Sequence, residues 1–411
     1  MKNSVVISVF CVLIAYVSLS LVMFMKLYPV RPLGWGQDKM MNQLFIIHKE
    51  DGLQRILTTK AYKTAKTSGI IQRLKGAAST IETRHRAENI ESQKFAPRKN
   101  LIILSPGRGG SSFLGAMFDS SPQVMFWFEP LRIVTQKLYE AGVILKGHEL
   151  INFREMCVNL IDSFFKCDFS NIPNTTLSEY SRHIFRRRSE ALTSGYLCPN
   201  RSSGCLTFSD SLLKKACNSY KHTVIKILNS RVPNKTIQSF RKLFQQKNAY
   251  EVRLIHLVRD PRAVIYSRIY SVNWMKISYR DSKFRSYVQR LCDPIEQNIR
   301  MGLLYPPPWL KGRFKVVRYE DLVVSTVSIV QELYRFAGFD WSTSVDKWIS
   351  VHDRPPDNST AERNAYSLYR NASHVTDKWK NAPKDLIRVV EDTCNDLMSL
   401  LGYERWINRG R

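Results

Sequence analysis

The sequence predicts an α/β fold in which helices flank a mainly parallel central sheet. Short apolar runs of strand length recur along the chain, and most lead through a polar or glycine-rich turn into a helical pattern. This order is typical of parallel sheets with right-handed crossovers. No internal repeat occurs, and 44% hydrophobic residues in a chain of 411 allow one large domain or two ordinary ones. The predicted strands lie at residues 101–104, 124–128, 223–228, 254–258 and 314–322.

The first strand leads into a glycine-rich turn. Residues 101–104 are apolar, residues 107–110 contain three glycines, and apolar residues at helical spacing follow. We expect a strand, a phosphate-binding turn and a helix, because glycines let backbone N–H groups approach an anion and a helix N-terminus attracts negative charge. Arg108, Ser111 and Ser112 add a cation and two hydroxyl donors. A strand–helix turn without a ligand is the alternative interpretation.

This turn differs from the Walker A loop of kinases. Walker A requires Gly-Lys-Ser/Thr, whereas Gly110 is followed by Ser111 and the cation Arg108 comes earlier. The pattern therefore disfavours a P-loop kinase that uses a magnesium-bound triphosphate. It suits a nucleotide 5′-phosphate that carries a leaving group.

Charged residues accompany the second and third predicted strands. Glu129 directly follows 124–128, and Lys226 lies within 223–228. Ligand groups in open parallel sheets gather at the carboxyl ends of the strands, so Glu129 is a candidate catalytic residue. Its alternative role is that of a cap or turn residue. Lys226 either extends its ammonium out of the buried run or reaches an anion at the strand end.

The fourth strand, 254–258, leads into a second polar motif. Arg259 ends the strand, Asp260 is suited to an N-cap, and Pro261 is suited to the first helical position. Ser267 lies about two turns further on at helical spacing. Arg259 and Ser267 could share one phosphate, whereas a capped helix with a surface arginine is the simpler alternative.

Two helical patterns follow the last predicted strand, 314–322. Residues 327–337 are amphipathic and are closed by Gly338. Residues 386–401 form one apolar helix face that ends at Gly402. Core packing explains both patterns.

Seven of the eight cysteines follow residue 25, and this odd number leaves at least one without an intramolecular partner. Cys198 and Cys205 are close enough for a small disulfide loop. Cys394 either pairs with Cys292 or is an inert buried thiol. No Cys-x-x-Cys motif and no histidine pair with ligand spacing occurs, so we predict no zinc site.

The N-terminal segment predicts membrane attachment. Residues 5–25 are apolar and uncharged and are long enough to span a bilayer, with a cleaved signal peptide as the alternative. The expected organisation is a cytoplasmic tail (1–4), a transmembrane signal-anchor (5–25), a luminal stem (26–97) and a catalytic domain (98–411). Glycosylation sequons, which suit a luminal domain, occur at Asn174, Asn200, Asn234, Asn358 and Asn371.

The formal net charge is +27. Such a surplus predicts an anionic partner, which could be nucleic acid, anionic lipid or an acidic polysaccharide. Charge alone does not choose among these three.

Several motifs resemble those of the Golgi carbohydrate sulfotransferases. Residues 107–113 resemble the 5′-phosphosulfate loop of that family, and residues 259–267 resemble its 3′-phosphate motif. The resemblance covers about residues 98–405. Four further blocks resemble the galactose/N-acetylgalactosamine/N-acetylglucosamine 6-O-sulfotransferase group, at 128–131, 308–312, 317–322 and 366–379.

The resemblance implies 3′-phosphoadenosine 5′-phosphosulfate (PAPS) as the sulfate donor, without a metal. It assigns Arg108 to the bridging oxygen of the leaving phosphate. Ser111 and Ser112 are assigned to the 5′-phosphate, and Arg259 and Ser267 to the 3′-phosphate. The residues implied to bind the donor are Gly107, Arg108, Gly109, Gly110, Ser111, Ser112, Phe113, Arg259, Asp260, Pro261, Arg262, Ser267 and Arg370.

The resemblance also implies which residues are catalytic. Glu129 takes the place of the glutamate base of Golgi and heparan relatives, and Lys226 is expected to steady the sulfuryl oxygens. Leu228 stands where cytosolic relatives carry a histidine, so that base is absent. Gly107 and Gly109 depart from family members that often have threonine or tryptophan and serine there. This removes a serine side-chain contact and keeps backbone N–H donation.

The expected function is sulfate transfer to the 6-hydroxyl of galactose, N-acetylgalactosamine or N-acetylglucosamine in a glycosaminoglycan or related chain. Acceptors of keratan, chondroitin or N-acetyllactosamine type are expected, with no nucleic-acid partner, and a homo-oligomer is compatible with the sequence. The expected location is the Golgi membrane, as a single-pass type II protein with a luminal catalytic domain. A catalytically inactive luminal glycan-binding protein on the same fold is the alternative.

Overall fold

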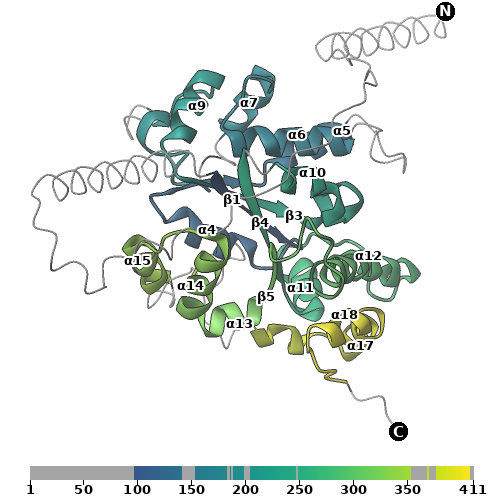
Figure 1. The fold of residues 1–411 in the computed structure, drawn as a ribbon. Coiled ribbons are helices and arrows are strands. Elements are labelled where there is room, and N and C mark those ends of the chain that lie inside the picture. The colour runs from purple at the N-terminus through teal and green to yellow at the C-terminus, as the bar shows by residue number, and fades with distance from the viewer. Residues whose placement is uncertain are drawn as a thin grey trace, which may run out of the picture. The chain divides into compact units, whose positions relative to one another are not determined.

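The computed structural model describes residues 97–140, 153–182, 186, 188–198, 204–246, 249–352, 368–369 and 376–407. Within these residues, five strands form one parallel sheet in the order β2-β3-β1-β4-β5 (Figure 1). The expected parallel α/β architecture is therefore confirmed for this part of the chain. The strands are β1 (Arg98–Ser105), β2 (Val124–Phe128), β3 (His222–Leu228), β4 (Tyr250–Val258) and β5 (Phe314–Arg318).

Strand β1 lies at the centre of the sheet. Leu101 is paired with Val224 of β3, and Ile102 is paired with Leu254 of β4. These side chains are fully buried, because both faces of the sheet are covered by helices. A near-continuous apolar run is the pattern expected of such a strand.

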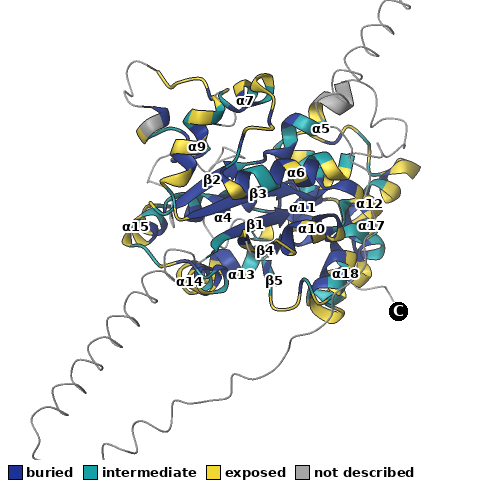
Figure 2. Cartoon of the chain, turned by 45° about the horizontal axis from the view of Figure 1, so that its top comes forward, coloured by how far each residue is buried: buried dark blue, intermediate teal, exposed yellow. Residues whose placement is uncertain are grey.

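Successive residues of β1 point to opposite faces and so contribute to two separate cores. Leu101 and Ile103 face one core, and Ile102 and Leu104 face the other. Figures 1 and 2 show the two helical layers on opposite sides of the buried strands. The first layer contains α4 (Ser111–Asp119), α13 (Tyr319–Val324), α14 (Thr326–Ala337) and α15 (Thr343–His352). The second contains α5 (Leu131–Glu140), α6 (Phe153–Lys166), α7 (Asn174–Tyr180), α9 (Asp210–Asn218) and α10 (Arg241–Phe244).

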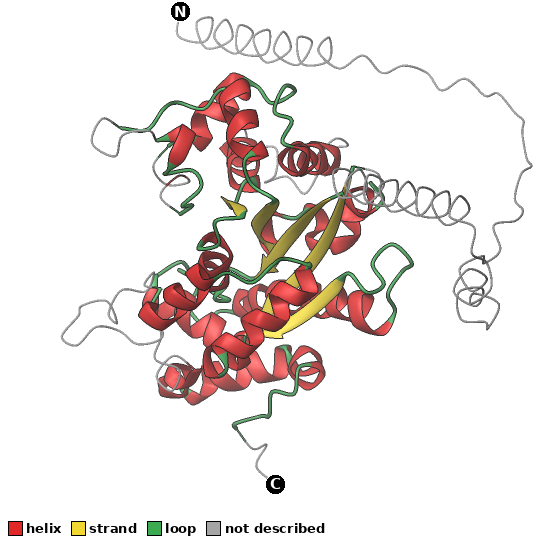
Figure 3. Ribbon diagram, turned by 60° about the vertical axis from the view of Figure 1, so that its left-hand side comes forward, coloured by secondary structure: helices red, strands yellow, loops and turns green. Residues whose placement is uncertain are grey.

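A third core lies beyond the end of β4, where a group of helices packs together (Figure 3). It is built on Val258, the last residue of β4, and on the buried faces of the helices that follow. Trp379 is a buried member of this core. The helices are α11 (Pro261–Tyr266), α12 (Ser282–Ile299), α17 (Lys384–Thr393) and α18 (Asn395–Leu400).

The described cysteines form three disulfides. Both pairs that the sequence suggests are present, Cys198–Cys205 and Cys292–Cys394. The third pair, Cys167–Cys217, joins the end of α6 to α9 and was not predicted. Cys157 is buried and is the free cysteine among the described residues.

Two element boundaries differ from the sequence prediction. The predicted strand 314–322 ends at Arg318, because Tyr319 turns inward as the first residue of α13 and packs into the core. The single predicted helix at 386–401 is divided into α17 and α18 at Cys394, whose backbone (φ −104°, ψ 18°) leaves the helical region. The amphipathic helix α14 and its left-handed end at Gly338 are confirmed.

None of the helices in the described part of the chain is long and apolar enough to cross a membrane. The predicted anchor at residues 5–25 and the predicted stem at 26–97 lie outside the described residues, except for residue 97.

Candidate functional site

The carboxyl ends of the parallel strands meet at one edge of the sheet. The chain passes from β1 to β2 on one side and later to β4 on the other, so β1 marks a topological switch point. Ligands of open α/β sheets bind at such points. The glycine loop follows β1, Glu129 follows β2 and Arg259 follows β4, so the topology brings the three predicted motifs to this edge.

The first loop, residues 106–110, turns sharply from β1 into α4. Arg108 (φ 75°) and Gly110 (φ 92°) both adopt left-handed backbone conformations. No side chain hydrogen bond caps α4, whose first residue is Ser111. The first N–H groups of a helix lack intrahelical acceptors, so an uncapped end of this kind is a suitable anion site.

Close packing explains why glycines occupy this loop. A Cβ at Gly110 would collide with the ring of Tyr319, and a Cβ at Gly109 would overlap the Oγ of Ser105. The buried Tyr319 ring also lies 4.7 Å from the Arg259 guanidinium. The loop is therefore fixed between the start of α13 and the end of β4.

The second motif follows β4 as the sequence predicts. The Asp260 carboxylate accepts a hydrogen bond from the Arg262 backbone N–H at 2.8 Å and caps α11, with Pro261 at its first position. Ser267 comes directly after α11 and begins a π-helical turn, Ser267–Ser271. Its side chain is buried and faces the first loop.

The two phosphate-type motifs are in direct contact. Arg108 Nε donates to Ser267 Oγ at 3.0 Å, and Arg259 Nη1 donates to the Arg108 carbonyl at 3.1 Å. Arg268 Nη2 donates to the Gly107 carbonyl at 3.0 Å. Three arginines and the loop thus form one continuous basic site.

Glu129 lies at the end of β2 in a buried ion-pair cluster. Its backbone is left-handed (φ 51°), and its N–H donates to the Lys226 carbonyl at 3.0 Å. Its Oε1 is 2.5 Å from Lys226 Nζ, and its Oε2 is 3.2 Å from Arg231 Nη2. Lys226 also lies 4.1 Å above the Phe128 ring. The carboxylate is therefore held between two cations.

Opposing effects act on the charges of this cluster. Burial alone would raise the pKa of Glu129, but the nearby Lys226 and Arg231 outweigh it, and the pKa is lowered. Burial lowers the pKa of Lys226, an effect that the Glu129 carboxylate opposes. Glu129 is therefore ionised at neutral pH.

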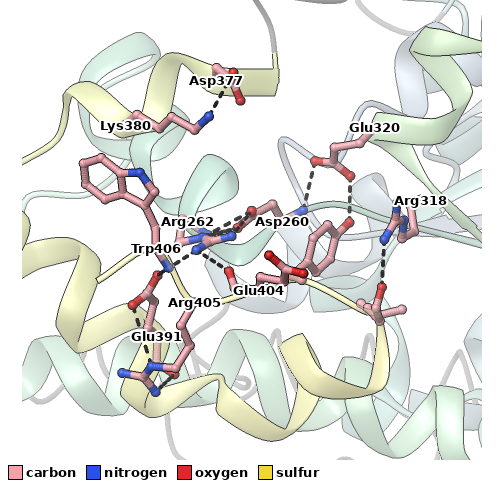
Figure 4. Close-up of polar contacts among 12 residues, drawn as sticks. Asp260, Arg262, Arg318, Glu320, Asp377, Lys380, Glu391, Glu404, Arg405 and Trp406 are labelled. Carbon is pink, nitrogen blue, oxygen red and sulfur yellow. Dashed lines mark hydrogen bonds and ion pairs between the residues drawn. The ribbon is translucent and has the colours of Figure 1, made fainter. Parts of the chain in front are cut away.

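A buried ion-pair network includes two residues of the second motif, Asp260 and Arg262, and holds them in place (Figure 4). Arg262 contacts the Asp260 carboxylate at 2.7 Å and the Glu391 carboxylate of α17 at 2.6 Å. It also donates to the Glu404 carbonyl at 2.9 Å and lies 3.9 Å from the Trp379 ring centre. These contacts anchor α11 to α17 and to the C-terminal segment.

Glu320 of α13 joins the same network. It accepts hydrogen bonds from the Asp260 backbone N–H at 3.1 Å and from the Tyr403 hydroxyl at 2.6 Å. Burial raises the pKa of Glu320, although Tyr403 and the positive charge of Arg259 act in the opposite direction. The segment 401–407 is therefore tied to the backbone of the second motif.

Two comparisons with known proteins decide the family. The sulfotransferase domain matches residues 98–402, most of the chain. Carbohydrate sulfotransferase 3 of Tetronarce californica is 30% identical over 334 residues, which cover 75% of this chain and 73% of that protein. The chain belongs to the carbohydrate sulfotransferase family. It is accordingly an enzyme that transfers sulfate.

Further carbohydrate sulfotransferases are similar over comparable lengths. Human carbohydrate sulfotransferase 6 is 30% identical, with 74% of this chain and 81% of the relative covered. Mouse carbohydrate sulfotransferase 1 is 25% identical, with 85% and 88% covered. Among solved structures, the sulfotransferase domain of the Synechococcus PCC 7002 olefin synthase is 17% identical with a TM-score of 0.37, covering 72% of this chain and 94% of that one.

Most residues that the sequence suggests for this sulfotransferase site lie at the sheet edge, but the side chains of Phe113 and Arg262 point elsewhere. Phe113 is buried in the core that contains α4. Arg262 directs its side chain into the buried network rather than toward the glycine loop, because two carboxylates and a carbonyl use its donors. Arg370 lies outside the described residues.

Sequence reasoning missed four residues of the site. Arg231 and Arg268 each follow a predicted motif by a few positions, but the sequence contains many arginines and nothing distinguishes these two. The sequence places Tyr319 in a strand and gives no sign that its ring packs against Gly110. Trp274 is about half exposed, and the centre of its ring lies 5.8 Å from the guanidinium carbon of Arg108.

The described residues contain no group of three or more histidine, cysteine, aspartate or glutamate side chains placed to hold a metal ion. Arginine and lysine side chains at the strand ends supply positive charge to the site.

Proposed function

We propose that this carbohydrate sulfotransferase uses PAPS as donor and transfers its sulfate to the 6-hydroxyl of a sugar in a glycan chain. The observation that carries the proposal is the contact between Arg108 of the glycine loop and Ser267 of the second motif. A donor with phosphates at both its 5′ and 3′ positions needs two adjacent anion sites. The contact brings two such motifs together.

The residues at the sheet edge fit the two ends of this donor. The uncapped start of α4, with Ser111 and Ser112, offers backbone N–H and hydroxyl donors to the 5′-phosphosulfate. Arg259 and Ser267 offer a cation and a hydroxyl to the 3′-phosphate. Arg108 belongs to the glycine loop and contacts Ser267 of the second motif. It is assigned to the oxygen that bridges phosphorus and sulfur, where negative charge develops as that bond breaks.

Glu129 is assigned as the base. The acceptor oxygen attacks sulfur in line, the bond from sulfur to the bridging oxygen breaks, and Glu129 takes the acceptor proton. Its lowered pKa keeps it ionised and able to accept a proton, although it also reduces its intrinsic basicity. Lys226 is assigned to the sulfuryl oxygens, close to this carboxylate.

We also propose a cell location, which the same family assignment supports. We assign the enzyme to the Golgi membrane as a single-pass type II protein, with residues 5–25 as the anchor and 98–411 as the luminal catalytic domain. The three disulfides within the described residues support an oxidising compartment. Keratan, chondroitin and N-acetyllactosamine chains are the proposed acceptor types.

Calorimetric titration of the protein with adenosine 3′,5′-bisphosphate tests the donor site. Arg259→Ala should weaken binding by about tenfold or more, since a charged hydrogen bond contributes about 1.5–3 kcal/mol. Lys384→Gln, an exposed change at the start of α17, is the matched control and should leave binding unchanged. Full affinity in Arg259→Ala would remove the 3′-phosphate assignment.

A further inference from the structure

A cavity of about 750 Å³ adjoins the Glu129 cluster. It lies between α5, the start of α6, one residue of α12 and two short 3₁₀ turns after β3, Asn229–Arg231 and Pro233–Lys235. Its volume is within the range of about 300–1,000 Å³ that is usual for small-molecule sites. The lining residues are Arg132, Thr135, Gln136, Phe153, Ser230, Arg231, Val232, Asn234, Lys235 and Pro294.

Arg231 connects this cavity to the reaction site. One face of the cavity is formed by Arg231, whose Nη2 is 3.2 Å from Glu129 Oε2. Arg132 also lines the cavity, and its backbone N–H donates to the Glu129 carbonyl at 2.9 Å. A ligand bound in the cavity therefore lies close to a ligand that contacts the Glu129 carboxylate.

The cavity is strongly positive. Among the described residues, its lining includes the cations Arg132, Arg231 and Lys235 and no carboxylate. Burial lowers the pKa of Arg231, and Arg132 lowers it further, while Glu129 opposes them. Burial likewise lowers the pKa of Lys235, with a further contribution from the charge of Arg290. Burial is the main cause of both shifts and repulsion between neighbouring cations adds to it, so an anion bound here favours the charged forms of Arg231 and Lys235.

Two residues that line the cavity have an uncommon backbone conformation. Asn234 and Lys235 both have left-handed backbones, with φ of 53° and 54°. The Lys235 carbonyl accepts a hydrogen bond from Asn298 Nδ2 at 2.9 Å, and its N–H donates to the Val232 carbonyl at 2.8 Å. Left-handed conformations of non-glycine residues cost free energy and concentrate at functional sites. Arg108 and Glu129 share this conformation at the sheet edge.

We propose that this cavity binds an anionic sugar unit of the acceptor chain, next to the unit that is sulfated at Glu129. The bound group is a carboxylate of a uronic acid or an existing sulfate ester. The inference rests on the proposed function and adds a requirement for a charged neighbour in the acceptor. The hydroxyl and amide side chains of Thr135, Gln136 and Ser230 are suited to the sugar hydroxyls of the same unit.

Kinetics of the full-length enzyme with matched acceptors test the proposal. The acceptors are desulfated chondroitin, the same chain with its carboxyl groups reduced, desulfated keratan, and keratan that carries sulfate. Wild type should show a lower KM for desulfated chondroitin than for its carboxyl-reduced form if a uronate is bound. A lower KM for sulfated than for desulfated keratan identifies a sulfate ester as the bound group.

Lys235→Gln is the decisive variant, since both backbone hydrogen bonds of Lys235 are independent of its side chain. It should raise KM for the charged acceptor about tenfold and leave KM for the neutral acceptor and for PAPS unchanged. Lys235→Arg should restore the low KM, and Lys384→Gln should behave as wild type. An equal change of KM for charged and neutral acceptors would overturn the inference, as would wild type that does not distinguish them.

Binding of a fluorescent chondroitin oligosaccharide, measured without PAPS, separates this inference from the proposed function. If wild type transfers no sulfate, the proposed function fails. Weaker binding of the charged oligosaccharide to Lys235→Gln, and not of its carboxyl-reduced form, still supports the cavity assignment. Equal binding of this oligosaccharide, and of a fluorescent sulfated keratan oligosaccharide, to wild type and Lys235→Gln rejects it.

Discussion

At the scale of single residues, the position of Glu129 is unusual. A carboxylate that is only 6% exposed is held between the ammonium of Lys226 and the guanidinium of Arg231 on a left-handed backbone. Such an arrangement fixes the direction of the carboxylate and keeps it ionised. Both properties suit a group that must accept a proton in one defined geometry.

Glu129→Gln should lower kcat by about 100-fold or more, since general acid–base catalysis contributes about 10²–10⁴-fold. Affinity for adenosine 3′,5′-bisphosphate should be unchanged, because β3 separates β2, which Glu129 follows, from β1 and β4, which carry the loops assigned to the two phosphates. Steady-state kinetics and calorimetry measure the two quantities. Glu332→Gln removes an exposed carboxylate paired with Lys315 and is the matched control. Normal turnover in Glu129→Gln would exclude Glu129 as the base.

His222 links stability to pH. Burial lowers its pKa from the ordinary 6.5 to about 4, and its ring stacks on Phe339 at 4.0 Å. Between these values the unfolded chain binds more protons than the folded protein, so His222 favours folding fully above about pH 6.5 and progressively less as pH falls toward 4. Asp119, whose pKa burial raises to about 8, contributes with the opposite sign.

Comparing wild type with His222→Gln isolates this contribution, because Asp119 is common to both. The substitution should destabilise the protein more at pH 7 than at pH 5, with a change of at most about 1.4 kcal/mol per pH unit for one proton. Denaturant unfolding at the two pH values measures the difference. A destabilisation that is larger at pH 5 would contradict this account of His222.

At the scale of elements, Arg262 holds the second motif in place. It is buried together with Asp260 and with Glu391 of α17, whose side chain is fully buried. Glu391 in turn accepts the backbone N–H groups of Trp406 and Ile407. The helix that carries the second motif is therefore positioned by residues near the C-terminus.

Arg262→Met should reduce the free energy of unfolding by about 3–5 kcal/mol, because it removes the cation that pairs with buried Asp260 and leaves buried Glu391 with only Arg405, at 3.9 Å. Arg388→Met removes an exposed arginine of α17 that is paired with Asp385, and it should change stability by less than about 1 kcal/mol. Chemical denaturation compares the two variants. Equal effects would show that the buried network does not stabilise the fold.

The sequence predicts local features of this enzyme better than distant contacts. The five strands, the glycine loop and the Asp260 cap depend on residues close together in the chain. The role of Arg262 depends on Glu391 and Glu404, which are 129 and 142 positions away. No pattern around Arg262 itself distinguishes a buried ion pair from a phosphate contact.

The two boundary errors have a similar origin. The predicted strand 314–322 includes a polar end, but the strand stops at Arg318 because Tyr319 packs against Gly110 of a distant loop. The helix at 386–401 is interrupted at Cys394, which is bonded to Cys292 of α12 across 102 positions. Arg231 became a site residue only because the 3₁₀ turn after β3 brings it to Glu129.

At the scale of the whole molecule, one sheet edge collects the functional groups. The strand order β2-β3-β1-β4-β5 places the ends of β1 and β4 side by side, and with them the two phosphate-type motifs. On the other side of β1, the ends of β3 and β2 bring Lys226 and Glu129 together. We assign the first pair to the donor and the second to the acceptor.

The most direct measurement offers the full-length enzyme PAPS with radiolabelled sulfate and a panel of desulfated glycans, and then maps the labelled carbon of the product. The account predicts label in a glycan, on carbon 6 of galactose, N-acetylgalactosamine or N-acetylglucosamine, and no transfer by Glu129→Gln above about 1% of wild type. Label on another carbon would contradict the 6-O assignment. No transfer from PAPS to any glycan by the wild-type enzyme would contradict the central claim.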